Sequence, residues 1–238
     1  MSSPLTLTHH IEAGVATITL DDGKANVMSL AMLGALNEAL DRAEEAKAVV
    51  MLAGRAGMFS GGFDLAAFKG DPAVALRMLI AGARLTERLL TYPHPVLAVC
   101  TGHAIAMGAF IVLSCDVRIG VDQGARIQAN EVQIGMTLPH FAIEVCRQRL
   151  HPAAFTQAAL TAFAHTPAQA LAAGFLDQTT PADALMGAAQ TQLARLKQLD
   201  AKAFTATKQR ARAATLTALR AAIETDISDW TARFQARS

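Results

Sequence analysis

Two stretches of the chain repeat one construction, in which a short apolar run is followed by a glycine-bearing turn and the start of a helix. The apolar runs are residues 48–53 and 96–100, and the turns lie in residues 59–65 and 101–110. Short continuous apolar runs are typical of strands buried on both faces, as in parallel sheets. Strands that alternate with helices favour parallel pairing through crossover helices. The repeat therefore predicts an α/β protein.

The other segments carry weaker signals of secondary structure. Alternating apolar and polar residues at 5–9 and 15–20 predict a hairpin. Residues 54–62 contain four glycines and are predicted to form an irregular loop, while residues 102–108 are predicted to turn the chain. Further elements are predicted as strands at 117–121 and 126–129 and as a helix at 139–150.

Three polar residues mark the starts of helices. Ser29, Asp71 and Thr166 each precede a run with helical periodicity, and proline directly follows the last two. Side-chain oxygens at the N-cap and proline at the first helical position are both common at helix N-termini. After residue 180 the pattern is helical only, so we expect a core domain at 1–180 and a helical region at 181–238. The apolar residues of that region pack either on the core or in a subunit interface.

The composition excludes several classes of protein. The hydrophobic fraction of 52% is too high for a disordered chain, and 21 basic against 20 acidic residues form no polybasic block for nucleic acid. The longest apolar stretches are far shorter than the roughly 20 residues of a membrane span. Three cysteines without a C-x-x-C pair, and no signal peptide pattern at the start, predict a cytoplasmic protein.

Cofactor and metal motifs are absent from the sequence. Neither the glycine fingerprint of dinucleotide sites nor the phosphate-binding P-loop occurs. His140 and Glu144 lie four residues apart on an expected helix, where both side chains could face one metal ion. No third ligand is evident nearby, so a hydrogen-bonded pair on the helix surface is the favoured reading. We therefore expect no metal and no separate cofactor.

The two glycine turns and one carboxylate are candidates for catalysis. Free backbone N–H groups occur at glycine turns and helix starts, and two turns facing one point can form an oxyanion hole. Glycine before a helix is also a common packing device. Glu131 is the only ionisable residue between Arg126 and His140. In apolar surroundings its pKa would rise, as suits a general base, whereas an exposed or salt-bridged loop glutamate is the alternative.

Matching segments spread over nearly the whole chain carry a family resemblance. They are Val15-Ala-Thr-Ile-Thr-Leu20, Lys24-Ala-Asn-Val-Met-Ser29, Val49-Val-Met-Leu-Ala-Gly54, Phe59-Ser-Gly-Gly-Phe-Asp-Leu65, Pro95-Val-Leu-Ala-Val-Cys-Thr-Gly-His-Ala104, Cys115-Asp-Val-Arg-Ile119, Asn130-Glu-Val-Gln-Ile-Gly135 and Ala170-Leu-Ala-Ala-Gly-Phe-Leu-Asp177. In order and spacing they resemble the crotonase, or enoyl-CoA hydratase/isomerase, superfamily. The resemblance implies a spiral of ββα units, a C-terminal helical region that builds homotrimers or dimers of trimers, and an acyl-CoA thioester substrate.

The resemblance also implies roles for individual residues. The backbone N–H groups of Phe63 and Met107 would form the oxyanion hole for the thioester oxygen. Lys208, of the same or of another subunit, would meet the phosphates of coenzyme A, unless it is only a solvated lysine of the tail. The remaining residues implied to bind coenzyme A or the acyl group are Lys24, Ala25, Gly61, Gly62, Asp64, Leu65, Gly108 and Phe110.

Two departures from the family pattern narrow the implied activity. Hydratases of the family resemble one another in having two glutamates that hold a water molecule. By the resemblance, Phe110 stands at the position of the first glutamate in this chain, and Glu131 is the second. Met107 stands where the family usually has glycine, and its side chain would narrow the acyl pocket. A single carboxylate suits isomerisation of 3-enoyl-CoA to 2-trans-enoyl-CoA, and the Glu131 segment is similar to that of monofunctional Δ3,Δ2-enoyl-CoA isomerases.

Three alternatives stay open at the level of sequence. The chain could be a weak hydratase or act on another acyl-CoA, with His103 or His140 as a second acid or base. It could bind acyl-CoA without catalysis. It could also be a helical interaction module built on residues 181–238, whose apolar positions would otherwise be trimer core.

Overall fold

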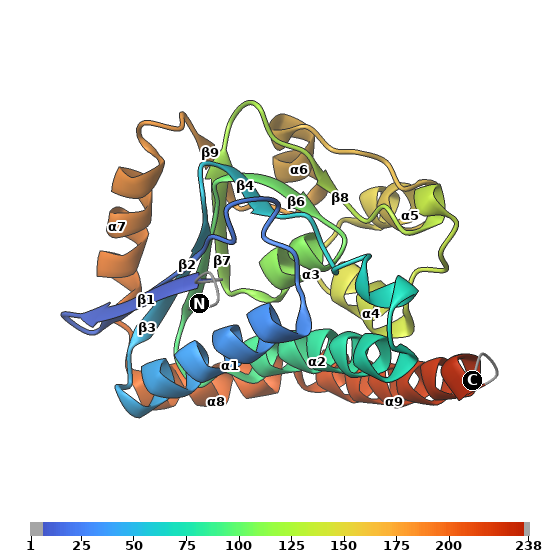
Figure 1. The fold of residues 1–238 in the computed structure, drawn as a ribbon. Helices are drawn as coiled ribbons and strands as arrows, with labels where there is room; N and C mark the ends of the chain where they lie inside the picture. The colour runs from blue at the N-terminus through green and yellow to red at the C-terminus, as the bar shows by residue number, and fades with distance from the viewer. Residues whose placement is uncertain (1–6, 236–238) are drawn as a thin grey trace.

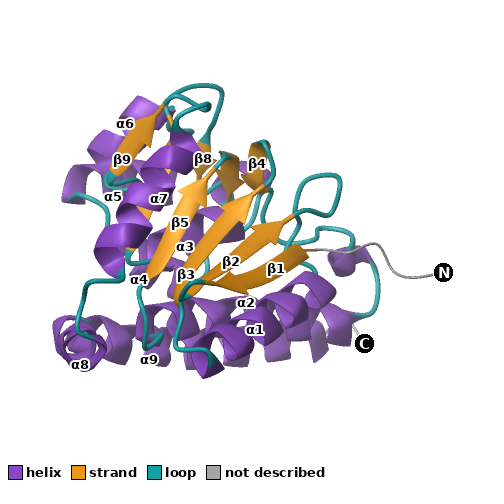
Figure 2. Ribbon diagram, turned by 90° about the vertical axis from the view of Figure 1, so that its left-hand side faces the viewer, coloured by secondary structure: helices purple, strands orange, loops and turns teal. Residues whose placement is uncertain are grey.

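The computed structural model describes residues 7–235, without the side chain of Gln235. The described residues form a six-stranded sheet in the order β1-β2-β3-β5-β7-β9 and a three-stranded sheet in the order β4-β6-β8 (Figures 1 and 2). Only the β1–β2 pair is antiparallel. The strands are β1 (Leu7–Glu12), β2 (Val15–Leu20), β3 (Val49–Gly54), β4 (Gly57–Ser60), β5 (Val96–Cys100), β6 (Gly102–Ile105), β7 (Val117–Val121), β8 (Ile127–Gln128) and β9 (Gln178–Thr180).

The predicted hairpin is confirmed as β1 and β2. Its connection is the pair Ala13 and Gly14, with φ angles of +48° and +78°. Two residues with positive φ match the two-residue turn that suits the twist of a hairpin. Leu5 and Thr6, which were predicted to begin the first strand, lie outside the described residues.

The expectation of irregular chain at residues 54–62 and 102–108 is wrong in part. Both segments contain a strand of the smaller sheet, β4 and β6, which pair in parallel. These strands have four residues each and contain glycine, so they show neither alternation nor a long apolar run. Their glycines permit close approach, because a Cβ on Gly102 would overlap the backbone of Gly57.

Successive units each contribute one strand to the larger sheet, one strand to the smaller sheet and then a helix. They are β3–β4 with α2, β5–β6 with α3, and β7–β8 with α4. This is the predicted crotonase-like spiral of ββα units. The helices and helical turns are α1 (Leu30–Glu45), η1 (Ala67–Lys69), α2 (Pro72–Thr91), α3 (Met107–Ser114), η2 (Val132–Ile134), α4 (His140–Arg147), α5 (Pro152–Thr161), α6 (Pro167–Ala173), α7 (Leu185–Leu196), α8 (Ala201–Ala211) and α9 (Ala213–Gln235).

The central strands are buried on both faces, as their apolar runs predicted. In β3, Val50 and Leu52 belong to the main core, while Met51 on the opposite face belongs to a second cluster with Leu97 and Leu193. Leu193 lies on α7, which covers this second face, while α1 and α2 lie on the other side of the sheet (Figure 2). Burial on both faces explains why these strands lack polar alternation.

The C-terminal helix α9 runs along α2 and α4 of the same chain (Figure 1). Its residues Leu216, Leu219 and Ile223 are buried in the main core, and the Trp230 ring packs edge-on against Phe141 at 6.3 Å. These apolar positions of the tail therefore pack on the core, whereas Leu199 is 43% exposed. The boundary at residue 180 stays a prediction. No helix among the described residues combines the length and apolarity needed to span a membrane.

Candidate active site

Asn26 organises the first glycine turn. It adopts φ +49°, and its Nδ2 donates to the carbonyl oxygens of Leu20 at 2.9 Å and Phe59 at 3.2 Å. The Ser60 hydroxyl donates to the Asn26 carbonyl at 2.7 Å and accepts from the Gly62 N–H at 3.2 Å. These bonds satisfy buried polar groups and so hold the turn in one conformation.

The second turn reverses direction at Ala106, immediately before α3. Ala106 has φ +50° and ψ −120°, an unfavourable conformation for a residue with a Cβ. Its carbonyl accepts from the Phe110 N–H at 3.1 Å, so Met107 is the first helical residue. A Cβ on Gly62 would lie 2.9 Å from Cβ of Ala106 and 3.5 Å from the nitrogen of Met107. The two turns therefore adjoin, and only glycine fits at the contact.

Each turn offers an amide to the space beside it. Within residues 7–235, neither the Phe63 N–H nor the Met107 N–H has a protein acceptor. The Met107 N–H is one of the unbonded donors that every helix start leaves. Two such donors on adjoining turns can serve one oxygen, as in an oxyanion hole. The structure thus brings together the two turns that the sequence singled out, and the assigned role stays a prediction.

The side chains of Phe63 and Met107 pack against α2. A Cβ on Gly82 would lie 2.5 Å from Cζ of Phe63 and 3.4 Å from Sδ of Met107. Met107 is fully buried. Its side chain fills the space under the first turn, and Met107 does not belong to the lining of the cavity described next.

Glu131 lies between β8 and η2 and is 6% exposed. Burial raises the pKa of its carboxyl group to about 7. Its Oε2 atom is buried and has no hydrogen-bond partner among the described residues. Glu131 is therefore neither an exposed nor a salt-bridged loop glutamate. A buried carboxylate with an unpartnered oxygen is costly for the fold and is a candidate for proton transfer.

An inner cavity of about 50 Å³ joins Glu131 to both turns. Glu131 is its only ionisable lining residue in the described chain. The Oδ1 atom of Asn130 is also buried without a partner there. The sequence analysis quoted Asn130 only inside a motif and assigned it no role. The lining residues are Gly61, Phe63, Leu65, Phe68, Leu79, Ala106, Asn130, Glu131, Ile134, Met136 and Pro139.

An outer cavity of about 320 Å³ adjoins the inner one, and six residues line both. The side chains that line only the outer cavity include Trp230 and Phe234 of α9, together with the cations Lys69 and Arg233. The sequence indicated that the tail was apolar but not which surface it faced. The shared residues are Leu65, Phe68, Leu79, Ile134, Met136 and Pro139.

Most of the residues expected to bind coenzyme A lie around the first turn. The Gly61 N–H donates to the Ala25 carbonyl at 2.7 Å, and Lys24 beside it is exposed. Asp64 accepts from the Ala66 N–H at 3.0 Å, while Leu65 is 55% exposed at the rim of both cavities. This group forms one continuous surface next to the inner cavity.

Two of the residues expected to bind the ligand serve packing instead. A Cβ on Gly108 would lie 2.6 Å from the Ser60 carbonyl oxygen, so this glycine lets α3 approach the first turn. Phe110 is fully buried, and its ring meets that of Phe141 edge-on at 5.8 Å. Phe110 lines neither the inner nor the outer cavity. A core aromatic side chain thus stands at the position where the resemblance implies the first glutamate of hydratases.

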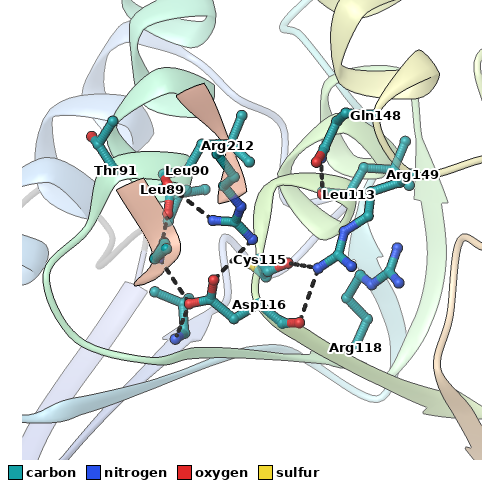
Figure 3. Close-up of polar contacts among 12 residues, drawn as sticks. Leu89, Leu90, Thr91, Leu113, Cys115, Asp116, Arg118, Gln148, Arg149 and Arg212 are labelled. Carbon is teal, nitrogen blue, oxygen red and sulfur yellow. Dashed lines mark hydrogen bonds and ion pairs between the residues drawn. The ribbon is translucent and has the colours of Figure 1, made fainter. Parts of the chain in front are cut away.

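The solvated alternative for Lys208 does not fit its position. Lys208 is 6% exposed, and its Nζ donates to Asp116 Oδ2 at 2.8 Å and to the Leu89 carbonyl at 3.1 Å. Arg212 meets the other Asp116 oxygen at 2.9 Å, as Figure 3 shows. The Lys208 ammonium is therefore engaged inside its own chain, away from both cavities. The solvated alternative is therefore wrong, and phosphate binding by Lys208 stays a prediction.

The two histidines considered as a second acid or base also lie outside both cavities. His103 Nδ1 accepts from the Arg126 N–H at 3.1 Å. His140 is exposed, and its Nε2 lies 3.7 Å from Asp229. Glu144, the possible metal partner of His140, accepts from Arg147 at 3.3 Å. The described residues contain no group of three or more His, Cys, Asp or Glu side chains that could hold a metal ion.

Comparisons with known proteins agree with this geometry. A profile of the family described as enoyl-CoA hydratase/isomerase matches residues 10–238. The chain is similar to human enoyl-CoA delta isomerase 1, mitochondrial, with 28% identity over 92% of this chain and 74% of that protein. Two solved structures are also similar: an enoyl-CoA hydratase/isomerase family protein from Pseudomonas syringae (42% identity, 94% and 97% coverage, TM-score 0.91) and an enoyl-CoA hydratase from Mycobacterium marinum (42% identity, 94% and 99% coverage, TM-score 0.90). Isomerase and hydratase names thus both occur among the similar proteins.

Proposed function

This chain belongs to the enoyl-CoA hydratase/isomerase family of enzymes, and we propose that within it the chain isomerises 3-enoyl-CoA to 2-trans-enoyl-CoA. The observation that carries the proposal is Glu131, the one ionisable side chain lining the described inner cavity. Moving a double bond along an acyl chain needs one base that takes a proton and returns it elsewhere. Hydration needs a water molecule held and activated as well, and Phe110 has no polar atom for that task.

In the proposed mechanism Glu131 works in its ionised form. The carboxylate takes a proton from C2, and the C2 electron pair delocalises over the thioester and the C3–C4 double bond as a dienolate. Protonated Glu131 then returns the proton to C4, which leaves the double bond between C2 and C3. A pKa of about 7 suits both halves of this transfer, because the group accepts and releases a proton near neutral pH.

The adjoining turns would stabilise the dienolate oxygen. We assign this role to the N–H groups of Phe63 and Met107, which have no protein acceptor in residues 7–235. One such donor typically contributes about 10²–10³ in rate. Coenzyme A would follow the surface at Lys24, Ala25 and Gly61, and the acyl chain would enter the outer cavity. The reaction needs no further cofactor, because coenzyme A arrives as part of the substrate.

Self-association belongs to the same proposal, as a homotrimer or a dimer of trimers. Val132, Ile134 and Leu160 are 47%, 46% and 67% exposed. Val132 and Leu160 border a hollow of about 580 Å³ between η2, α4 and α5. Exposed apolar groups around a hollow are typical of an interaction surface. Light scattering of the purified protein tests this part, and a monomer at all concentrations would contradict it.

The decisive experiment is an assay of 3-enoyl-CoA conversion with the wild type and with Glu131→Gln. Loss of a general base is expected to lower kcat about 10²–10⁴-fold. Glu144→Gln is a matched control, because Glu144 lies on the neighbouring α4 but outside both cavities. Equal rates for wild type and Glu131→Gln would reject the proposed role.

The same preparation separates the alternatives. Hydration of 2-enoyl-CoA as fast as isomerisation would contradict the argument from one carboxylate. Binding of acyl-CoA with no turnover of either substrate would instead identify a non-catalytic binding protein. A Phe110→Glu variant adds a check, since a gain of hydration in it would show that the missing carboxylate limits that reaction.

A further inference from the structure

The first turn of α4 is capped from another helix. Its N-cap residue is Pro139, which has no side-chain acceptor. Asp226 of α9 supplies one instead: its Oδ1 accepts from the His140 N–H at 2.9 Å and its Oδ2 from the Phe141 N–H at 2.7 Å. A carboxylate at a helix N-terminus satisfies unbonded N–H groups and interacts favourably with the helix dipole. The cap joins segments that lie 85 residues apart in sequence.

The capped turn is also the end of the segment that carries Glu131. The Met136 N–H donates to the Glu131 carbonyl at 2.9 Å, and Met136 and Pro139 line the inner cavity together with Glu131. At the other end, the Gln128 carbonyl accepts from the Ala106 N–H at 2.8 Å. The segment is therefore attached at its start to the second turn and at its end, through α4, to Asp226.

Within its own chain, the segment between these attachments has little packing apart from the contact of η2 with α5. Val132, Gln133, Ile134, Gly135 and Thr137 are all exposed. Segments with few buried contacts open locally at low free energy. The conformation that buries Glu131 against the inner cavity therefore depends on how firmly the two ends are held.

The side-chain hydrogen bonds of Asp226 within the described residues are the two bonds of this cap. Asp226 is 2% exposed and forms no ion pair with any residue in 7–235. Burial raises its pKa, while the two N–H donors and His140 act in the opposite direction and Asp229 adds to the effect of burial. A buried carboxylate is retained at a cost when its bonds are few. Its two bonds to α4 are the contacts that explain its presence here.

We propose that Asp226 is a positioning residue of the active site, which holds the first turn of α4 and thereby the Pro139 end of the Glu131 segment. The C-terminal helix α9 then does more than cover the core, because it fixes the geometry of the catalytic carboxylate. This inference rests on the proposed function of Glu131.

The test compares Asp226→Ala with Asp200→Ala. Asp200 is a matched control, because it also caps a helix, accepting from the Ala203 N–H at 2.8 Å at the start of α8, away from both cavities. Both variants lose one helix cap, but only Asp226→Ala releases the Glu131 segment. We expect kcat to fall about 10–100-fold in Asp226→Ala, as for a displaced catalytic group, and to stay unchanged in Asp200→Ala.

Two further readouts separate positioning from a structural role. Water admitted to the released segment would lower the pKa of Glu131 towards the ordinary value for glutamate, so the acid limb of the pH profile of kcat/KM should move to lower pH. Burial raises the pKa of Cys146, and the nearby charge of Glu131 adds to this effect, so Cys146 is a titratable group that also faces Glu131. Hydrogen exchange of the amides in residues 131–141 should increase in Asp226→Ala and not in Asp200→Ala.

Hydrogen exchange needs no turnover, so it tests the positioning even if the proposed activity is wrong. An Asp226→Ala protein with unchanged kcat, pH profile and exchange, but a lower Tm, would reduce Asp226 to a structural cap. Asp226→Asn serves if the alanine variant does not fold. The amide oxygen of asparagine replaces one of the two acceptors. We therefore expect kcat and the hydrogen exchange of Asp226→Asn to lie between those of wild type and Asp226→Ala. Values equal to those of wild type would overturn the proposal.

Discussion

Two largely buried carboxylates in this protein, Asp116 and Glu131, have opposite surroundings. The carboxylate of Asp116 accepts hydrogen bonds from Lys208 Nζ at 2.8 Å and from the Val96 N–H at 2.9 Å, and it forms an ion pair with Arg212 at 2.9 Å. It belongs to the polar cluster in Figure 3. Glu131 lies in an apolar cavity with one oxygen unpartnered in the described chain. A buried charge with partners on all sides supports the fold, whereas one without them is free to exchange a proton. The difference separates a structural carboxylate from a candidate catalytic one.

The largest effect should follow from removing the structural charge. Asp116→Asn would leave the buried cations Lys208 and Arg212 without their counter-charge. Breaking a buried ion pair from one side typically destabilises by about 3–5 kcal/mol. Chemical denaturation measures the free energy of unfolding, with Asp41→Asn as the control, because Asp41 is 61% exposed in its pair with Arg88. The control should lose less than about 1 kcal/mol. If both variants lost the same free energy of unfolding, the description of Asp116 as a structural carboxylate would be wrong.

The catalytic candidate should show the reverse effect on stability. Because the folded protein raises the pKa of Glu131 from 4.5 to about 7, it binds this proton more tightly than the unfolded chain does. Stability therefore falls as pH rises from about 4.5 to about 7, by up to about 3 kcal/mol. Glu131→Gln removes this loss, so it should be more stable than wild type at pH 8 and gain nothing at pH 4. Denaturation curves at both pH values check this, and a variant less stable at pH 8 would contradict it.

A smaller effect concerns the rate in the wild type. If ionised Glu131 is the base, kcat/KM should rise with pH and level off above about 7. The rate at pH 6 should then be about ten-fold below that at pH 8, which corresponds to about 1.4 kcal/mol. Asp116→Asn should keep the same profile in its folded fraction. A shift of the profile in that variant would mean that the two carboxylates are not independent.

Local signals in the sequence predicted much of the fold. The hairpin, the buried strands and the N-caps at Ser29, Asp71 and Thr166 all occur where expected. Each depends on a few neighbouring residues, such as an apolar run or a side-chain oxygen beside a free N–H. The strands β4 and β6 were missed because a strand of four residues with glycine carries no such pattern.

The candidate site was predictable to a similar extent. The two turns and Glu131 are visible as glycines, a helix start and a solitary carboxylate. The outer cavity could not be predicted from the sequence. Its wall includes Trp230, which lies on a helix whose apolar face could equally have packed against another subunit. The burial of Lys208 was missed for the same reason: its partner Asp116 lies 92 residues earlier, and no periodicity links the two.

The amino-acid sequence by itself determined the order of strand, turn and helix, the adjacency of glycine to free amides, and the presence of one carboxylate where the family resemblance implies two in hydratases. These are properties of short segments. The tertiary structure decided which carboxylate is neutralised and which is not, and it brought Asp226 of α9 to the first turn of α4. Burial and pairing decide the behaviour of a charge, and both come from residues that only the folded chain brings together.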